Sequence, residues 1–193
     1  MKPSFVAVLL SSMIAGCGGG GGEPDADDGA PAPEPASEVA AEATADSVRA
    51  DMVDARGIGI GAVYLTAGGD GVALDGALIG LPPGEHGFHI HDTGTCESPG
   101  FESAGDHVGA ADAAHGTGAV GGPHAGDLRN LIVEADSTGT VDQTNERVTL
   151  RGGAVDLLDD DGSALVIHAM PDDYLTQPSG GSGDRIACGV IGE

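Results

Sequence analysis

The chain has 193 residues, of which 40% are hydrophobic, and this is enough for one folded domain with extensions. The 31 acidic residues outnumber the 7 basic ones, so the formal net charge is −24, and such a chain is not suited to binding nucleic acid. Glycine is abundant at 35 residues and tryptophan is absent, a composition that favours short strands and turns around small aliphatic side chains.

Residues 1–16 are predicted to be the signal peptide of an exported lipoprotein. Lys2 precedes an apolar run over residues 5–10, and residues 14–17, which end in Cys17, resemble the lipobox of bacterial lipoproteins. The resemblance implies cleavage before Cys17, lipid on its sulfur, and a periplasmic or cell-surface protein held at a membrane. The alternative is an ordinary cleaved signal with an incidental cysteine. No other stretch is long and apolar enough to span a bilayer.

Residues 17–46 carry the lipidated cysteine and a tether. They are rich in glycine, proline and acidic residues without periodic apolar positions, so we expect a flexible chain that spans on the order of 30 Å. A folded domain is predicted over residues 47–193. Its cysteines, Cys96 and Cys188, remain as a pair once Cys17 is assigned to lipid, and an oxidising compartment predicts a disulfide between them.

The domain is predicted to be all-β. Short runs of β-forming residues are separated by Gly, Asp and Pro, without convincing helical periodicity. The runs are residues 48–53, 59–66, 71–78, 86–91, 130–135, 139–143, 147–150, 164–168 and 186–190. About eight antiparallel strands at this spacing predict a sandwich or barrel. Residues 92–127 and 169–185 lack strand patterns, and loops of such length usually carry function.

The run over residues 86–91 places two imidazoles side by side. Successive side chains of a strand point to opposite faces, so His89 and His91 share one face while Phe88 and Ile90 share the other. We expect the histidine pair to face outward as metal ligands and the apolar pair to enter the core. His86, on the apolar side, is predicted to be a hydrogen-bonded structural histidine.

The remaining histidines lie in or beside the two long loops or at a strand end. Each alone would be unremarkable, but their concentration in glycine-rich loops indicates metal binding. Imidazoles without thiolates suit Cu, Zn, Ni or Fe, and a carboxylate among them suits Zn. Two sites are predicted, with His107 between them as a ring that could serve both metals. The first combines His89, His91 and His168, and the second combines His115, His124 and Asp127.

Five segments closely resemble the copper,zinc superoxide dismutases, and most closely those exported by bacteria. They are residues 86–91, 104–107, 122–128, 165–168 and 183–192, within a resemblance that runs from about residue 48 to the C-terminus. The resemblance implies an eight-stranded antiparallel Greek-key sandwich or barrel of the immunoglobulin-like kind, with two long functional loops.

The resemblance also implies roles for individual residues. Asp172 would hydrogen-bond one copper ligand and one zinc ligand, and Arg185 would guide and hold an anion beside copper. The implied copper ligands are His89, His91, His107 and His168, and the implied zinc ligands are His107, His115, His124 and Asp127.

The implied activity is dismutation of superoxide to dioxygen and hydrogen peroxide. Copper would change oxidation state, zinc would be structural, and His107 would bridge the metals and carry a proton, so His107 and Arg185 are the predicted catalytic residues. The expected partners are the superoxide anion and a membrane reached through the lipid anchor, and a homodimer is left open. The alternative is a non-enzymatic copper-binding or copper-delivery module on the same fold. A copper-only form is disfavoured by the intact zinc set.

Overall fold

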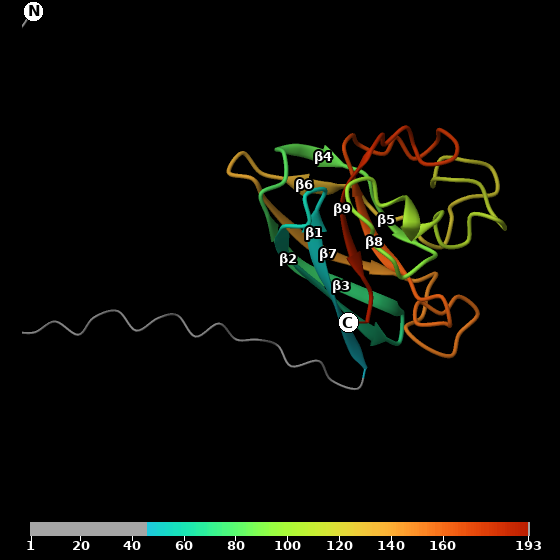
Figure 1. Ribbon diagram of the computed structural model, residues 1–193. Coiled ribbons are helices and arrows are strands. Elements are labelled where there is room, and N and C mark those ends of the chain that lie inside the picture. The colour runs from blue at the N-terminus through green and yellow to red at the C-terminus, as the bar shows by residue number, and fades with distance from the viewer. Residues whose placement is uncertain (1–45, 193) are drawn as a thin grey trace, which may run out of the picture. The chain divides into compact units, whose positions relative to one another are not determined.

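The computed structural model describes residues 46–192, so the predicted signal peptide, Cys17 and nearly all of the tether lie outside the described residues. The strands are β1 (Ser47–Asp54), β2 (Gly59–Gly68), β3 (Gly71–Ile79), β4 (Gly84–His86), β5 (Phe88–His91), β6 (Leu131–Val133), β7 (Thr138–Asn145), β8 (Ala164–His168) and β9 (Arg185–Val190). One 3-10 turn, η1, covers Glu102–Ala104 (Figure 1). Within this part of the chain no helix has the length and apolar character needed to cross a membrane.

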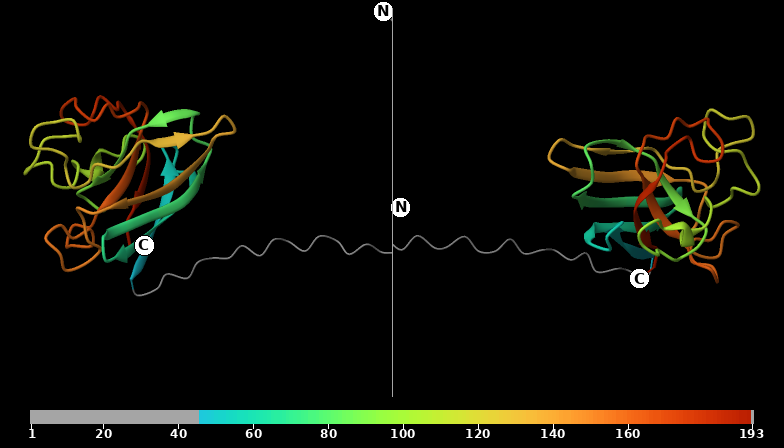
Figure 2. Two further views of the ribbon diagram at one scale, coloured as in Figure 1. Left: turned by 180° about the vertical axis from the view of Figure 1, so that it is seen from behind. Right: turned by 45° about the horizontal axis from the view of Figure 1, so that its top comes forward.

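The strands form one antiparallel sheet that curls into a nearly closed barrel. Their order is β4-β6-β7-β3-β2-β1-β9-β8-β5, and Gly87 alone separates β4 from β5, which stand at the two ends of that order (Figures 1 and 2). The links from β3 to β4 and from β7 to β8 join strands that are not neighbours, which gives the Greek-key topology. The all-β prediction is confirmed.

The strand count differs from the prediction at two places. The run over residues 86–91 is two strands, because β4 pairs with β6 whereas β5 pairs with β8, and the change of partner falls at Gly87. The predicted strand over residues 147–150 is wrong, since only an isolated bridge from Thr149 to Asp156 forms there. Val148 and Leu150 are nevertheless buried, so the alternating pattern arises from a loop packed on the core.

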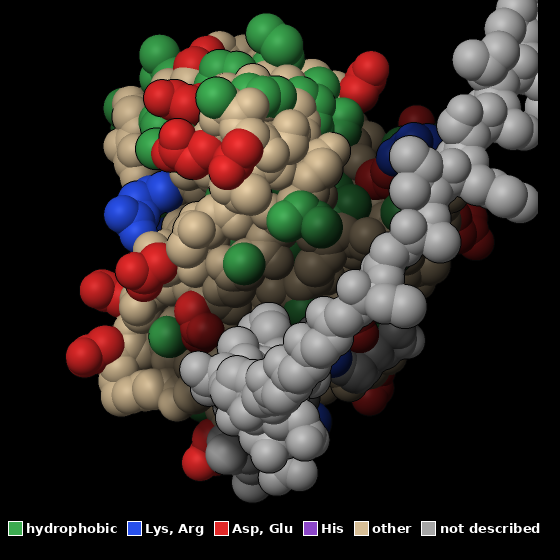
Figure 3. All heavy atoms as spheres, turned by 90° about the vertical axis from the view of Figure 1, so that its left-hand side faces the viewer, with side chains coloured by type: hydrophobic (Ala, Val, Ile, Leu, Met, Phe, Trp, Pro, Cys, Tyr) green, Lys and Arg blue, Asp and Glu red, His purple; other side chains and the backbone are tan. Residues whose placement is uncertain are grey.

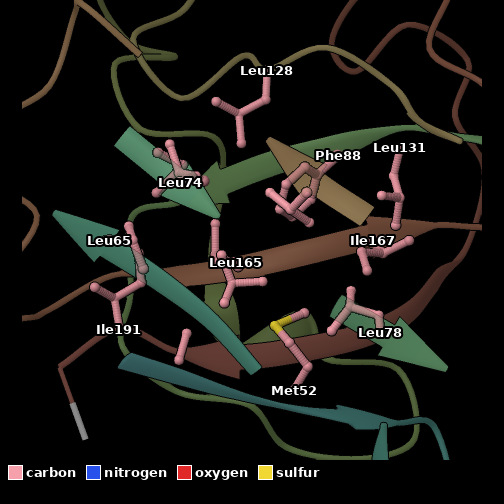
Figure 4. Packing of buried hydrophobic residues seen from close by; sticks show 14 of the residues in the cluster. Met52, Leu65, Leu74, Leu78, Phe88, Leu128, Leu131, Leu165, Ile167 and Ile191 are labelled. Carbon is pink, nitrogen blue, oxygen red and sulfur yellow. The ribbon is translucent and has the colours of Figure 1, made fainter. Parts of the chain in front are cut away.

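Aliphatic side chains from most of the strands fill the barrel. Met52, Leu65, Leu78 and Leu165 converge with Phe88 in the interior (Figure 4). Strand β8 is buried on both faces, which is why its sequence is continuously apolar rather than alternating. The outward face of β8 is covered by a second, smaller cluster made by Phe101, Ala104, Ala164, Val166 and Cys188.

The two long loops gather on one side of the barrel, where the segments after β5 and after β8 are drawn in yellow and red in Figures 1 and 2. A disulfide joins Cys96 in the first loop to Cys188 in β9, as predicted. The disulfide ties the first long loop to β9, the strand that begins at Arg185. On the face shown in Figure 3, acidic side chains are spread over the surface and basic ones are few.

Candidate metal centre

Strand β5 is the rigid element on which the site is built. His89 and His91 alternate with Phe88 and Ile90 as expected, yet all four side chains are buried. The outward-facing pair is buried because the first long loop runs alongside β5 where another strand would pair. The N–H of Ile90 donates to the carbonyl of Gly126, and the N–H of Val108 donates to that of Ile90. The residues next to Val108 and Gly126 are His107 and Asp127, which this pairing brings to the histidine pair.

Four histidines form the first group. One ring nitrogen each from His89, His91, His107 and His168 lies within 4.8 Å of the others. Among the described residues, the buried side-chain nitrogens and oxygens without a hydrogen-bond partner are His89 Nδ1, His91 Nε2, His107 Nε2 and His168 Nε2. Leaving a buried polar atom unpaired costs about 1–3 kcal/mol. Four such atoms, which converge from β5, β8 and the first long loop, therefore fit a metal ion.

The second nitrogen of each ring in this group is held by an acceptor. His91 Nδ1 donates to the carbonyl of Gly105 at 3.0 Å, and His168 Nδ1 donates to that of Gly183 at 3.0 Å. Because a carbonyl oxygen only accepts, these contacts put the proton on Nδ1 and leave the lone pair of Nε2 free. The backbone thus fixes the tautomer that binds a metal.

The second group is centred on Asp127. Its Oδ1 lies 2.9 Å from His107 Nδ1, 3.0 Å from His115 Nδ1 and 3.4 Å from His124 Nδ1, and His107 Nδ1 is 3.4 Å from His124 Nδ1. Four ligands placed tetrahedrally at zinc bond lengths would stand about 3.4 Å apart. The spacing therefore fits a zinc ion without a large rearrangement of the side chains.

His89 also lies within 4.8 Å of His107, His115 and Asp127. Its Nε2 is hydrogen-bonded to Asp172 at 3.0 Å, and its Nδ1 is one of the four unpaired nitrogens of the first group. We therefore assign His124 rather than His89 to the second group. His107 belongs to both groups, because its Nδ1 faces Asp127 while its Nε2 faces the other histidines.

Asp172 connects the two groups through the ring nitrogens of His89 and His115 that face away from the proposed metals. Its Oδ2 lies 3.0 Å from His89 Nε2, and its Oδ1 lies 2.9 Å from His115 Nε2, all in the buried interior. Asn130 fixes the backbone at this point, since its side-chain oxygen accepts from Asp172 N–H and its amide donates to Asp172 C=O, both at 3.0 Å. Sequence reasoning missed Asn130, because a single asparagine at the start of a strand-like run carries no distinctive signal.

Burial sets the charge state of three histidine rings of the first group. It lowers the pKa of His89 to about 3 and that of His168 to about 4, and it holds the pKa of His91 well below its usual value. These rings are neutral at pH 7, which is the form that binds metals. Burial opposes ionisation of Asp127, but hydrogen bonds from His107 and from the Gly116 N–H outweigh it and keep the Asp127 pKa below its usual value.

Arg185 lies beside the first group, on the wall of a hollow of about 610 Å³ that His91, His107 and His168 also line. Its Nη1 donates to the carbonyl of Phe101 and its Nη2 to that of Gly105, each at 2.7 Å. The Gly105 carbonyl also accepts from His91, so one backbone oxygen fixes both the ring and the guanidinium. Burial lowers the pKa of Arg185, and nearby carboxylates, Asp106 first among them, oppose that shift.

His86 stands apart from both groups. Its ring nitrogens lie 2.7 Å from the carbonyl oxygen of His168 and 2.8 Å from that of Pro82, which is the structural role predicted for it.

A four-histidine group and a three-histidine carboxylate group that share one ring define a dinuclear metalloprotein on an antiparallel barrel. The family model for copper/zinc superoxide dismutase matches residues 60–191, and the chain belongs to that family. It is 47% identical over 134 residues to the Cu-Zn superoxide dismutase of Caulobacter vibrioides, an alignment that covers 68% of this chain and 77% of that protein.

Solved structures agree with the sequence comparison. The crystal structure of a superoxide dismutase-like protein from Bacillus subtilis matches with a TM-score of 0.71 at 39% identity, over 74% of this chain and 96% of that one. The Cu/Zn superoxide dismutase from Brucella abortus matches with a TM-score of 0.60 at 28% identity, over 75% of this chain and 99% of that one.

Proposed function

We propose that this chain dismutates superoxide to dioxygen and hydrogen peroxide at the four-histidine group. The observation that carries the proposal is the convergence of four unpaired ring nitrogens beside the hollow that Arg185 lines. The proposed copper ligands are His89, His91, His107 and His168, and the proposed zinc ligands are His107, His115, His124 and Asp127. Copper, when bound, supplies the one-electron chemistry that oxidises one superoxide and reduces another.

The protein groups provide the charge, the proton and the orientation. Arg185 is a permanent cation whose fork suits a small anion in the hollow. His107 Nε2 is the atom that takes up and returns a proton, because Nδ1 lies on the side of Asp127, where it would bind zinc and the ring would stay in place. Asp172 orients His89 and His115 through their Nε2 atoms.

The alternative of a copper-binding or copper-delivery module is not favoured by the relatives from Caulobacter vibrioides and Aquifex aeolicus, which are named as Cu-Zn superoxide dismutases. His168→Gln tests the assignment, since His168 belongs only to the first group. The variant should lose copper and superoxide consumption while it retains about one zinc per chain. Unchanged activity would contradict the proposed site, and joint loss of both metals would contradict its division into two groups.

We also propose the domain organisation and location inferred from the sequence: a signal peptide over residues 1–16, lipid on Cys17, a tether to residue 46, and the enzyme domain over residues 47–193 outside the cytoplasm. Support comes from the lipobox-like residues 14–17 and from the Cys96–Cys188 disulfide, a bond typical of oxidising compartments. Cys17→Ser should move the protein from the membrane fraction to the soluble one. A homodimer stays a prediction, and light scattering of the purified protein tests it.

A further inference from the structure

The turn from His124 to Asp127 carries two ligands of the second group. It is hydrogen-bonded by Asn145 at the end of β7 and by Arg147 just after it. Asn145 is the last residue of β7 and is buried, and its Nδ2 donates to the carbonyl of Ala125 at 2.7 Å. The Asn145 Oδ1 accepts from the backbone N–H of Arg147 at 2.9 Å. The Arg147 side chain then reaches the same turn, where Nε donates to the carbonyl of His124 at 3.2 Å and Nη2 donates to that of Asp127.

The turn's own hydrogen bonds are few. Asp127 N–H donates to His124 C=O at 3.3 Å, and His124 N–H donates to Asp127 Oδ2 at 3.0 Å. Gly126, in the middle of the turn, is bonded to the rest of the protein, because its carbonyl accepts from the N–H of Ile90 in β5 and its N–H donates to the carbonyl of Val108. The fork of Arg147 adds a connection at the carbonyls of the two ligand residues themselves, and a planar guanidinium loses less freedom per hydrogen bond than a flexible ammonium would.

We propose that Arg147 is a positioning residue for zinc: by holding the carbonyls of His124 and Asp127 it keeps two ligands assembled and slows zinc loss. The inference rests on the zinc ligands proposed above. The side-chain hydrogen bonds of Arg147 do not reach the four-histidine group, whose members come from β5, β8 and the segment at residue 107. Removing the Arg147 side chain should therefore speed the loss of zinc and leave copper binding unchanged.

The experiment compares Arg147→Ala, Arg147→Lys and the control Arg129→Ala in the metal-loaded protein. Arg129 Nη2 donates to the carbonyl of Asp142, so the control removes the same charge and a backbone hydrogen bond without touching the turn. Zinc transfer to a chromogenic chelator gives the release rate, and the retained copper is measured in parallel. We expect release to be about 10- to 100-fold faster in Arg147→Ala, as for other residues that orient metal ligands, with no change in the control.

Arg147→Lys keeps the charge and the aliphatic stem but cannot present the planar fork, so we expect an intermediate release rate. This variant decides the matter if Arg147→Ala fails to fold. Zinc release as slow as in the wild type, or equal loss of zinc and copper, would overturn the inference. A wild-type protein that binds no zinc would instead refute the ligand assignment, so the two failures are distinguishable.

Discussion

Asp172→Ala should weaken zinc binding more than copper binding. The carboxylate accepts from His89 Nε2 with one oxygen and from His115 Nε2 with the other. His89 lies in β5, where pairing with β8 fixes its backbone whether or not Asp172 is present. His115 lies in a loop, and apart from Asp127 and Asp172 it is held by the side chain of Gln177. The loop ligand therefore depends more on the carboxylate than the strand ligand does.

The size of the effect follows from the hydrogen bond that His115 loses. A hydrogen bond to a charged group contributes about 1.5–3 kcal/mol, and a residue that orients a metal-bound imidazole typically changes metal affinity by about 10- to 100-fold. We expect a decrease of that size in zinc affinity and a smaller one in copper affinity. Competition titrations with chelators of known affinity measure both constants.

Asp173→Ala is the matched control for this experiment. Asp173 is the next residue and is exposed, and its carboxylate accepts hydrogen bonds from Leu175 and Thr176 in its own turn. The Asp173→Ala variant should bind both metals as the wild type does. If Asp172→Ala binds zinc as tightly as the control, the reasoning that Asp172 orients the zinc ligand is refuted.

Three further predictions concern rate, pH and covalent structure. Arg185→Ala should keep both metals but react with superoxide about 10- to 100-fold more slowly in pulse radiolysis at matched salt, and equal rates would show that Arg185 does not attract the substrate. The metal-free protein should lose stability as the pH falls below 6.5, because unfolded His89 and His168 take up protons there while the folded rings, with pKa values of about 3 and about 4, do not. At pH 5 the loss is about 2 kcal/mol for each ring, and urea midpoints that do not change between pH 7 and 5 would contradict it. Removing the Cys96–Cys188 disulfide, which spans 92 residues, opens a long loop in the unfolded chain. It should cost about 4–5 kcal/mol of unfolding free energy in the chain-entropy model, and urea titration of a Cys96→Ser, Cys188→Ser variant against the wild type checks this.

The sequence predicts the parts of the site that depend on residue type and local geometry. Strand alternation places His89 and His91 on one side of β5, and the apolar run of β8 ends at His168, so the rigid part of the first group can be inferred from local patterns. The fold class follows from the short strands and glycine-rich turns. The disulfide follows from the number of cysteines, since pairing needs only two partners and an oxidising compartment.

Other features depend on contacts between distant segments. The burial of the histidine pair results from loop residues that pair with Ile90, and which nitrogen of each ring stays free depends on carbonyls such as those of Gly105 and Gly183. The segment over residues 147–150 was also not predictable from local pattern, because its alternating residues predict a strand although it forms a loop. Its contacts with the His124–Asp127 turn are set by tertiary packing, which a single sequence does not encode locally.

The central claim is that the chain consumes superoxide catalytically at a copper site paired with zinc. Pulse radiolysis of the wild-type protein, with its metal content measured on the same sample and with and without cyanide, tests it most directly. The account predicts about one copper and one zinc per chain and a cyanide-sensitive second-order rate that approaches the diffusional range of about 10⁸–10⁹ M⁻¹s⁻¹. A protein that holds both metals at this stoichiometry but does not accelerate superoxide decay would contradict it.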